Sequence, residues 1–239
     1  MTESVYVKQA ITEDDIVEVA TLWNRSAAWL RSRGLDQWQY PVKWENIRRA
    51  VADGTCWLVT AGDGRTIGTI TVEYTADPYW LPTDDPGDAL YIHRMVVDDE
   101  ARGGELGSAL LDWAARKAEN LGRFWLRLDA WKSNPALHQY YLDRGFTLVR
   151  IDDNPSDPTG ACFQRPASVR LHRGPDVIED GALEIESNVP GGDGPHGAKA
   201  GSGAPLPQAD ISVNTAGVHV ADAAATIHSE VRSRLSKTH

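Results

Sequence analysis

The positions of the aromatic side chains divide this chain of 239 residues into a part that can build a core and a part that cannot. All nine tryptophans precede residue 132, and no Phe, Tyr or Trp follows Arg173. Aromatic side chains supply much of the buried area of a protein core. We therefore expect a folded domain over residues 1–173, which is long enough to bury a core without disulfide bonds.

The residues after 173 have the composition of a linker followed by a short amphipathic segment. Residues 190–207 are mainly Gly, Pro, Ala and Ser, which bury too little apolar surface to offset the entropy lost on ordering. We expect a flexible, disordered Gly/Pro/Ala-rich linker over residues 174–219. Apolar residues at helical spacing then predict a short terminal helix over residues 220–239, and a solvated tail is the alternative for so short a segment.

Charge and cysteine content exclude several classes of protein. The formal net charge is −10, whereas proteins that bind a phosphate backbone are normally basic, so we expect no nucleic-acid partner. The tail alone holds nine acidic and four basic residues, while residues 101–150 hold eight basic and five acidic ones. Two cysteines, no apolar run of about 18 residues and no signal-peptide pattern indicate a cytoplasmic protein without a membrane partner.

Hydrophobic periodicity predicts an α/β (α+β) fold in which a mixed central β-sheet is flanked by helices. The predicted strands are residues 55–61, 66–74, 90–97, 124–129, 146–150 and 169–172. The predicted helices are residues 12–33, 44–52, 107–120 and 134–144. Residues 77–88 contain three prolines and four aspartates, which predicts a loop.

A glycine-rich turn between the predicted strand 90–97 and helix 107–120 is the first candidate binding site. Its residues are Arg102, Gly103, Gly104, Glu105, Leu106, Gly107 and Ser108. Glycines let a backbone approach a ligand closely, and the first N–H groups of a helix attract anions. The turn therefore indicates a phosphate or pyrophosphate site, and an ordinary strand-to-helix turn is the alternative. No Walker-type loop occurs in the sequence, and no GxGxxG fingerprint follows a predicted strand.

A second candidate segment opens the predicted helix 134–144. Asn134 suits the N-cap position and Pro135 suits the first helical position. Tyr141 lies seven residues after Asn134, about two turns along the same face, where its phenol can reach the mouth of a cleft. Packing of Tyr140 and Tyr141 against a core is the alternative for these residues taken alone.

The two segments together resemble the GNAT superfamily of acetyl-CoA-dependent N-acetyltransferases. The family pattern [QR]-x-x-G-x-[GA], whose backbone amides cradle the pyrophosphate of coenzyme A, matches residues 102–107. The later family signature, an Asn followed by a Tyr seven residues on and then Gly-Phe, matches Asn134, Tyr141 and Gly145-Phe146. The resemblance covers about residues 5–173 and implies the GNAT acyl-CoA N-acyltransferase fold.

This resemblance implies acetyl-CoA as the co-substrate and assigns roles to several residues. It implies that one strand segment pairs its backbone with the pantetheine arm and polarises the thioester carbonyl: Met95, Val96 and Val97. It also implies that Asn134 contacts the coenzyme arm and that Tyr141 protonates the leaving thiolate as a general acid. One departure is Glu105, which stands where the pattern has Gly; a carboxylate there repels a pyrophosphate unless it points to solvent.

The general base has several candidates at this level. His93 lies two residues before Met95 on the predicted strand, and a neutral imidazole with a pKa of about 6.5 suits the role; a structural histidine or a substrate contact is the alternative. Glu73 and Asp129 are further candidates, and in many relatives a chain of water molecules serves instead. His and Cys residues are too scattered for metal-ligand spacing, so we expect no metal.

We expect an enzyme that transfers an acetyl group directly from acetyl-CoA to a primary amine of a small molecule. Acidic residues in 77–88 and 98–100 would attract a cationic amine, and five aromatic residues are candidates for the pocket lining: Trp38, Tyr40, Trp44, Tyr79 and Trp80. Core packing and a solvated acidic surface are the alternative for these residues. The alternative functions are a non-catalytic acyl-CoA-binding or sensing module and a protein acetyltransferase acting on N-termini or lysines. A homodimer is the expected assembly.

Overall fold

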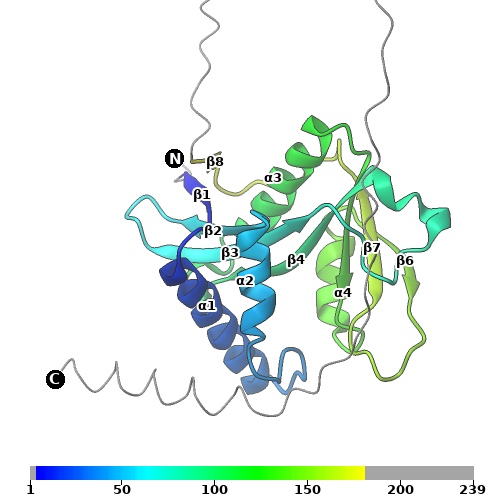
Figure 1. Ribbon diagram of the computed structural model, residues 1–239, viewed down its shortest axis with the longest axis horizontal. Helices are drawn as coiled ribbons and strands as arrows, with labels where there is room; N and C mark the ends of the chain where they lie inside the picture. Colours follow the sequence, from blue (N-terminus) through cyan, green and yellow to red (C-terminus); the bar gives the residue numbers. More distant parts are fainter. Residues whose placement is uncertain (1–3, 181–239) are drawn as a thin grey trace, which may run out of the picture. The chain divides into compact units, whose positions relative to one another are not determined.

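The computed structural model describes residues 4–180, and in this part of the chain one eight-stranded sheet carries helices on both faces (Figure 1). The strand order is β6-β7-β5-β4-β3-β2-β1-β8. The strands are β1 (Val5–Gln9), β2 (Cys56–Thr60), β3 (Thr66–Glu73), β4 (Ala89–Val97), β5 (Trp125–Ala130), β6 (Thr147–Ile151), β7 (Ala161–Pro166) and β8 (Val177–Glu179). The helices are α1 (Glu13–Ser32), α2 (Trp44–Ala52), α3 (Leu106–Asn120) and α4 (Pro135–Leu142), with short 3-10 turns at Pro82–Asp84, Pro86–Asp88 and Asp99–Ala101. The predicted fold class, a mixed sheet flanked by helices, is confirmed.

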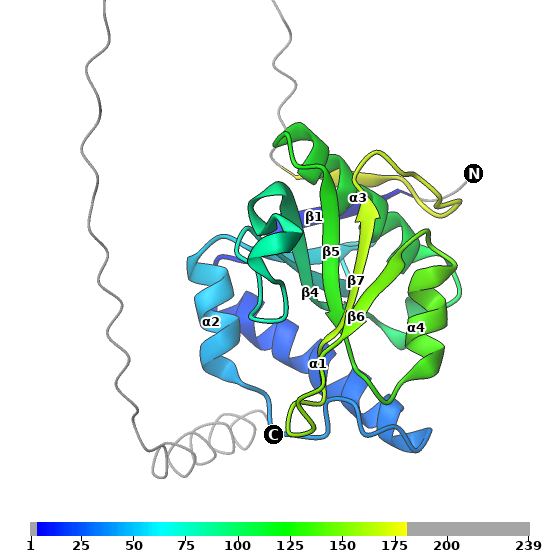
Figure 2. The same ribbon diagram turned by 90° about the vertical axis from the view of Figure 1, so that its right-hand side faces the viewer.

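The alternation along β2 shows how the sheet separates its two faces. Trp57 and Val59 belong to the core cluster that contains the apolar side of α3, while Cys56 and Leu58 belong to the cluster with α1 and α2. Successive side chains of a strand point to opposite faces, so a strand that is covered on both faces is a continuous apolar run. Figure 2 shows α2 and α4 on opposite sides of β4 and β5.

One extra residue in β4 changes the register of the sheet at its centre. In the antiparallel pairing with β3, Thr71 lies opposite His93 and Thr69 lies opposite Val96, so two residues of β4, Arg94 and Met95, lie opposite the single Ile70 of β3. Arg94 lies within this bulge and has a φ of 46°. A bulge of this kind bends the strand and increases its twist, so β4 turns away from its other neighbour at this point.

The second neighbour of β4 is β5, and the two strands separate beyond the bulge. Their parallel pairing runs from Ala89 opposite Trp125 to Ile92 opposite Leu128. Beyond Ile92, β4 continues to Val97 without a strand on its β5 side in the described sheet. Backbone N–H and C=O groups on that edge therefore remain available to a ligand.

The ends of the described domain differ from the sequence-based expectation. Strands β1, β7 and β8 form where no strand is predicted, and residues 169–172, predicted as a strand, form none. The backbone N–H groups of Leu171 and His172 donate to the carboxylate of Asp112 on α3 instead of to a neighbouring strand. β8 pairs in parallel with β1, so the sheet extends past the predicted domain end at Arg173. The remainder of the predicted linker and the predicted helix over 220–239 lie outside the described residues.

A buried ion pair joins β7 to α3. The Arg165 guanidinium donates to Asp112 over 2.9 Å, and both side chains are fully buried. Burial alone would raise the pKa of Asp112, but hydrogen bonds from the backbone and ring of His172, together with Arg165, lower it. Asp112 is thus a satisfied carboxylate that joins α3, β7 and the chain leading to β8.

The acidic loop between β3 and β4 is anchored to the sheet by two arginines. The buried Arg127 of β5 donates to the carbonyl oxygen of Asp84 over 2.6 Å and lies 4.6 Å above the ring of Trp80. Arg150 of β6 makes a bidentate pair with the Asp84 carboxylate at 2.5 and 2.7 Å. These contacts hold the loop, and with it Asp77, in a defined place above the sheet.

Within residues 4–180, no helix is both long enough and apolar enough to span a bilayer.

The buried ion pair gives a prediction about stability. Replacing Asp112 with Ala leaves Arg165 buried without a charged partner, with only the carbonyl oxygens of Arg144 and Leu111 as acceptors, so we expect the free energy of unfolding to fall by about 3–5 kcal/mol. Urea denaturation measures this loss. The matched control is Glu119→Ala, which breaks a surface ion pair with Arg170 and should cost about 0–1 kcal/mol. Equal losses in the two variants would contradict the role given to Asp112.

Candidate functional site

A groove of about 480 Å³ opens where β4 and β5 separate. It contains most of the residues predicted to bind the coenzyme: Met95, Val96, Val97, Arg102, Gly103, Glu105, Leu106, Gly107 and Asn134. Two predicted residues, Gly104 and Ser108, do not line it. The groove is also lined by residues that were not predicted as ligands, among them Leu137 and Tyr140 of α4 and Arg144 just after it.

The glycine-rich turn forms one end of this groove. The first turn of α3 has no side-chain cap, so its N–H groups are free of side-chain partners. The absence of a side chain at Gly107 matters because a Cβ atom there would overlap the hydroxyl of Tyr140. Arg102 pairs with Asp99 over 2.5 Å and lies 3.8 Å above the ring of Trp29. The Arg102 side chain therefore holds the turn against α1.

The α4 helix begins at Asn134 as predicted, and both ends of the Asn134 side chain have partners in the protein. Its Oδ1 accepts from the N–H of Leu137 over 3.1 Å, which caps the helix. Its Nδ2 donates to Oε1 of Gln37 over 2.8 Å. Asn134 therefore joins α4 to the segment between α1 and α2, and it borders the groove through this capping arrangement.

A second, smaller cavity of about 210 Å³ adjoins the groove. It lies between the sheet, the first turn of α2 and the α1–α2 connection, and its lining includes Tyr40, Lys43, His93 and Asp129. Of the five aromatic residues predicted for the pocket, Trp38 and Tyr40 line it, whereas Trp44, Tyr79 and Trp80 do not. Two aromatic residues that were not predicted, Trp23 and Trp131, line it as well.

Tyr141 is common to the groove and the cavity. The residues that line both are Gln37, Trp38, Met95, Leu137 and Tyr141. Tyr141 is 8% exposed and packs against Phe146 and Phe163. Burial raises the pKa of its phenol, so Tyr141 remains protonated at neutral pH and can donate a proton at the junction.

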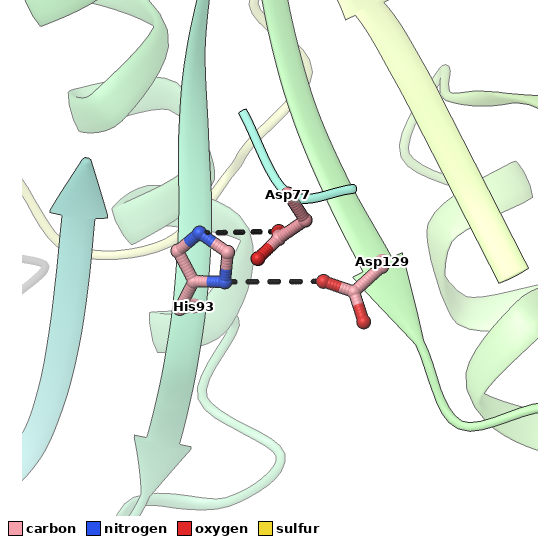
Figure 3. Close-up of side chains that lie close together, drawn as sticks. All are labelled: Asp77, His93 and Asp129. Atoms are coloured by element: carbon pink, nitrogen blue, oxygen red, sulfur yellow. Dashed lines mark ion pairs between the residues drawn. The ribbon is translucent and has the colours of Figure 1, made fainter. Parts of the chain in front are cut away.

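Two carboxylates flank His93, which lines the smaller cavity (Figure 3); this cavity is called the acceptor-side cavity below. Nε2 of His93 lies 3.5 Å from Oδ2 of Asp77, and Nδ1 lies 3.8 Å from Oδ1 of Asp129. The three groups come from the loop after β3, from β4 and from β5. Their ligand-type atoms lie within 4.8 Å of one another, so this is the group of described side chains that could hold a cation.

Burial shifts the pKa values of Asp77, His93 and Asp129 in the direction that favours the neutral form of each group. Burial raises the pKa of Asp129 to about 6, and the neighbouring Asp77 adds to this effect. Burial likewise raises the pKa of Asp77 to about 6, with a contribution from Glu73. Burial lowers the pKa of His93, because it disfavours the charged imidazolium. At neutral pH the cluster therefore holds a neutral imidazole between two carboxylates.

The three predicted base candidates differ in what surrounds them. Both ring nitrogens of His93 face carboxylates. Glu73 is paired with Arg94 over 2.8 Å and does not line the acceptor-side cavity. Asp129 lines that cavity and makes no ion pair with Lys or Arg among the described residues. Asp77 was not singled out from the sequence, because the acidic loop contains four aspartates and spacing does not show which of them folds over β4.

A sequence model of the Acetyltransferase (GNAT) family matches residues 18–146, which is more than half of the chain. The chain belongs to the GNAT acetyltransferase family. The uncharacterized N-acetyltransferase YesJ of Bacillus subtilis is 25% identical over 159 residues, covering 64% of this chain and 87% of YesJ. A GNAT acetyltransferase of Listeria monocytogenes has a TM-score of 0.58 and 22% identity, covering 70% of this chain and 98% of that one. Ard1 of Thermoplasma volcanium has a TM-score of 0.51 and 16% identity, covering 68% and 97%.

Membership in the GNAT family confirms the resemblance inferred from the two motifs and makes the protein an acetyl-CoA-dependent acyltransferase. The structure shows how Glu105, which departs from the family pattern, is accommodated in the turn. Glu105 adopts a left-handed backbone with a φ of 60°, which Gly adopts without steric cost. Its carboxylate pairs with Arg144 over 3.3 Å. A Cβ atom at Gly174 would lie 2.9 Å from Cβ of Glu105, so the chain after residue 173 packs closely on this turn.

Glu105 gives a prediction about coenzyme binding in this GNAT protein. Glu105→Gly removes the left-handed strain and should raise the free energy of unfolding by about 1 kcal/mol. Glu105→Gln keeps the strain but removes the charge. Both variants release Arg144 and remove a negative charge from the turn, so we expect each to lower the Kd for acetyl-CoA by up to about fivefold. Isothermal titration measures the Kd, and an unchanged value in both variants would show that the carboxylate does not influence the ligand.

Proposed function

We propose that this protein transfers an acetyl group from acetyl-CoA to a primary amine of a small molecule by direct attack of the amine on the thioester. The observation that carries this proposal is the junction at Tyr141, where the large groove meets a small cavity containing Asp129. A thioester in the groove and an amine in the cavity would both reach the same buried phenol.

The groove is the proposed site of acetyl-CoA, and its residues fit that ligand. The unpaired edge of β4 beyond Ile92 offers backbone groups to the amides of a pantetheine arm. The uncapped first turn of α3 offers N–H groups to a pyrophosphate. The coenzyme supplies the acetyl group as a thioester. Backbone N–H groups near Met95 would stabilise negative charge that develops on the thioester oxygen.

Asp129 is the proposed general base, with His93 beside it. With a pKa of about 6, Asp129 is ionised at neutral pH and accepts a proton from the ammonium of the acceptor. The free nitrogen then forms the N–C bond as the C–S bond breaks. The sulfur takes its proton from Tyr141, and the second proton lost by the nitrogen restores the Tyr141 phenol through solvent. The neutral His93 ring fills the space between Asp129 and Asp77 and adds no positive charge that would oppose the incoming ammonium.

The size of the acceptor-side cavity supports a small molecule over a protein chain as the acceptor. Its volume is about 210 Å³, whereas a cavity of roughly 150 Å³ is filled by benzene. An assay of thiol release from acetyl-CoA across a panel of small primary amines tests this proposal. Thiol release with peptide N-termini or lysine peptides alone would favour the protein acetyltransferase. Binding of acetyl-CoA without thiol release for any amine would favour the non-catalytic module.

The first prediction from this mechanism concerns Tyr141. Tyr141→Phe keeps the ring that packs on Phe146 but removes the proton donor, so we expect kcat to fall by roughly 100-fold. The Kd for acetyl-CoA should change little. Tyr6→Phe on β1, which lines neither cavity, is the matched control. A Tyr141→Phe variant with unchanged kcat would remove the proposed acid.

The second prediction concerns pH. Because Asp129 acts as a base, its ionised form is the active one, and kcat/KM should fall as the pH drops through about 6. Asp77→Asn removes a negative neighbour, so the pKa of Asp129 should decrease and this limb of the profile should move to lower pH. Measuring both enzymes with the same amine cancels the ionisation of the acceptor. A limb that does not move in Asp77→Asn would assign it to a different group.

A further inference from the structure

We propose that the acceptor carries a carboxylate or a comparable anionic group in addition to its reacting amine, so that it is a small molecule of amino-acid type. This inference rests on the proposed function, because it assigns the chemistry of the acceptor that enters the same cavity. It follows from the way charge and hydrogen-bond donors are distributed over the cavity lining.

The wall formed by α2 and the bulge of β4 carries positive charge. Lys43 and Arg94 both line the cavity. Lys43 forms no ion pair among the described residues, and its ammonium lies 5.1 Å from the ring centre of Tyr40. Arg94 is paired with Glu73 over 2.8 Å, so one arginine charge is balanced while the lysine charge is available. Lys43 is exposed, so its ammonium is free to pair with an anionic group of the acceptor.

A buried donor without a partner lies on the α1 side of the same cavity. Trp23 is 8% exposed and lines the cavity, and its Nε1 has no hydrogen-bond partner among the described residues. Indole nitrogen can only donate, so a ligand that satisfies it must present an acceptor atom. The ring centre of Trp23 lies 4.5 Å from that of Trp38 in a stacked pair, which limits the freedom of the indole to turn elsewhere.

The opposite part of the lining carries the groups that suit an amine. Asp129 lies on β5 with His93 next to it, and both line the cavity. Asp77 faces the far ring nitrogen of His93 and does not line the cavity. The acids of the site are therefore concentrated around His93. The free donors, Lys43 and Nε1 of Trp23, lie on the part of the lining formed by α1 and the start of α2, which we call the helical wall. A purely cationic polyamine would leave the Trp23 N–H unpaired and would be repelled by Lys43.

The two parts of the lining bound one small space. Its volume of about 210 Å³ is somewhat larger than the roughly 150 Å³ that holds benzene. A molecule of that size can present an amine to Asp129 and an anionic group to the helical wall at the same time. A charge-assisted hydrogen bond to the anionic group would favour such an acceptor over its neutral analogue by roughly 10- to 100-fold.

Matched acceptors test this inference with the full-length protein. Each set contains a free amino acid, its carboxamide and the corresponding amine without the carboxyl group, assayed by thiol release from acetyl-CoA. We expect kcat/KM for the best free amino acid to exceed that of its two analogues by roughly 10- to 100-fold. Most of the difference should appear in KM, because the anionic group is bound equally in the ground state and the transition state.

Three variants connect this preference to named residues. Lys43→Gln removes the charge and Trp23→Phe removes the N–H while keeping an aromatic ring; each should raise KM for the amino acid and leave KM for the amine analogue nearly unchanged. Arg48→Gln is the matched control, because it removes a cation from α2 that does not line the cavity. Circular dichroism verifies that each variant is folded.

The outcomes separate this inference from the proposed function. Equal or faster acetylation of the carboxamides and simple amines would overturn the anionic-group assignment and leave the acetyltransferase proposal standing. A preference for amino acids that survives in both Lys43→Gln and Trp23→Phe would overturn the assignment of the helical wall. No thiol release with any acceptor, in a protein that binds acetyl-CoA, would overturn the proposed function itself.

Discussion

The insertion of one residue in β4 is the constraint on which both cavities depend. With a regular β4, the parallel pairing with β5 would continue past Ile92 and close the sheet. The bulge at Arg94 ends that pairing and also reverses which side chains face which helix layer. His93 lines only the acceptor-side cavity, Met95 lines both cavities, and Val97 lines only the groove, while Met95 and Val97 pack on the cluster that contains α3. One irregular residue therefore creates a free backbone edge and distributes neighbouring side chains of β4 over the two cavities.

Two buried aspartates show how the surroundings decide the role of a carboxylate. Asp112 receives hydrogen bonds from Arg165 and from the backbone and ring of His172, and its pKa is lowered. Asp129 is also buried, but it lies beside the neutral His93 and the acidic Asp77, and its pKa is raised to about 6. Desolvation acts on both carboxylates in the same direction, but Asp112 is surrounded by donors whereas Asp129 has a second carboxylate nearby. The first therefore stabilises the fold and the second is suited to exchange a proton at neutral pH.

The parts of the structure that sequence predicts well are those set by local pattern. Helix α3 and the turn before it follow from apolar spacing and glycines, and α4 begins at the cap that Asn134 supplies. The strand β7 was missed because Arg165 interrupts its apolar pattern, and Arg165 is tolerated there only because Asp112 lies opposite, which is a tertiary contact. Residues 169–172 were wrongly predicted as a strand because their apolar pattern suits one. In the structure the N–H groups of Leu171 and His172 donate to Asp112 instead, which is again a tertiary contact.

In the candidate site, too, residues of contiguous motifs could be predicted, whereas residues that come together from distant segments could not. Tyr141 and the turn before α3 belong to contiguous motifs, so their spacing in the sequence is informative. The groups around His93 are not contiguous: Asp77 is brought over β4 by a loop that Arg127 and Arg150 hold through Asp84. Trp23 and Lys43 reach the cavity from α1 and from the start of α2. The proposed acceptor site therefore depends on contacts between distant segments, which periodicity and motif spacing do not record.

The segment between α1 and α2 contributes residues to the lining of both cavities. Trp38 lines both of them and has a φ of 59°, a conformation that costs a bulky residue about 1–2 kcal/mol. Such strain persists only where neighbouring contacts outweigh it. Here Asp36 accepts from Nε1 of Trp131, and Gln37 accepts from Asn134 at the start of α4. Asn134 also caps the helix that carries Tyr141, so an unbroken series of contacts runs from this segment to the proposed proton donor.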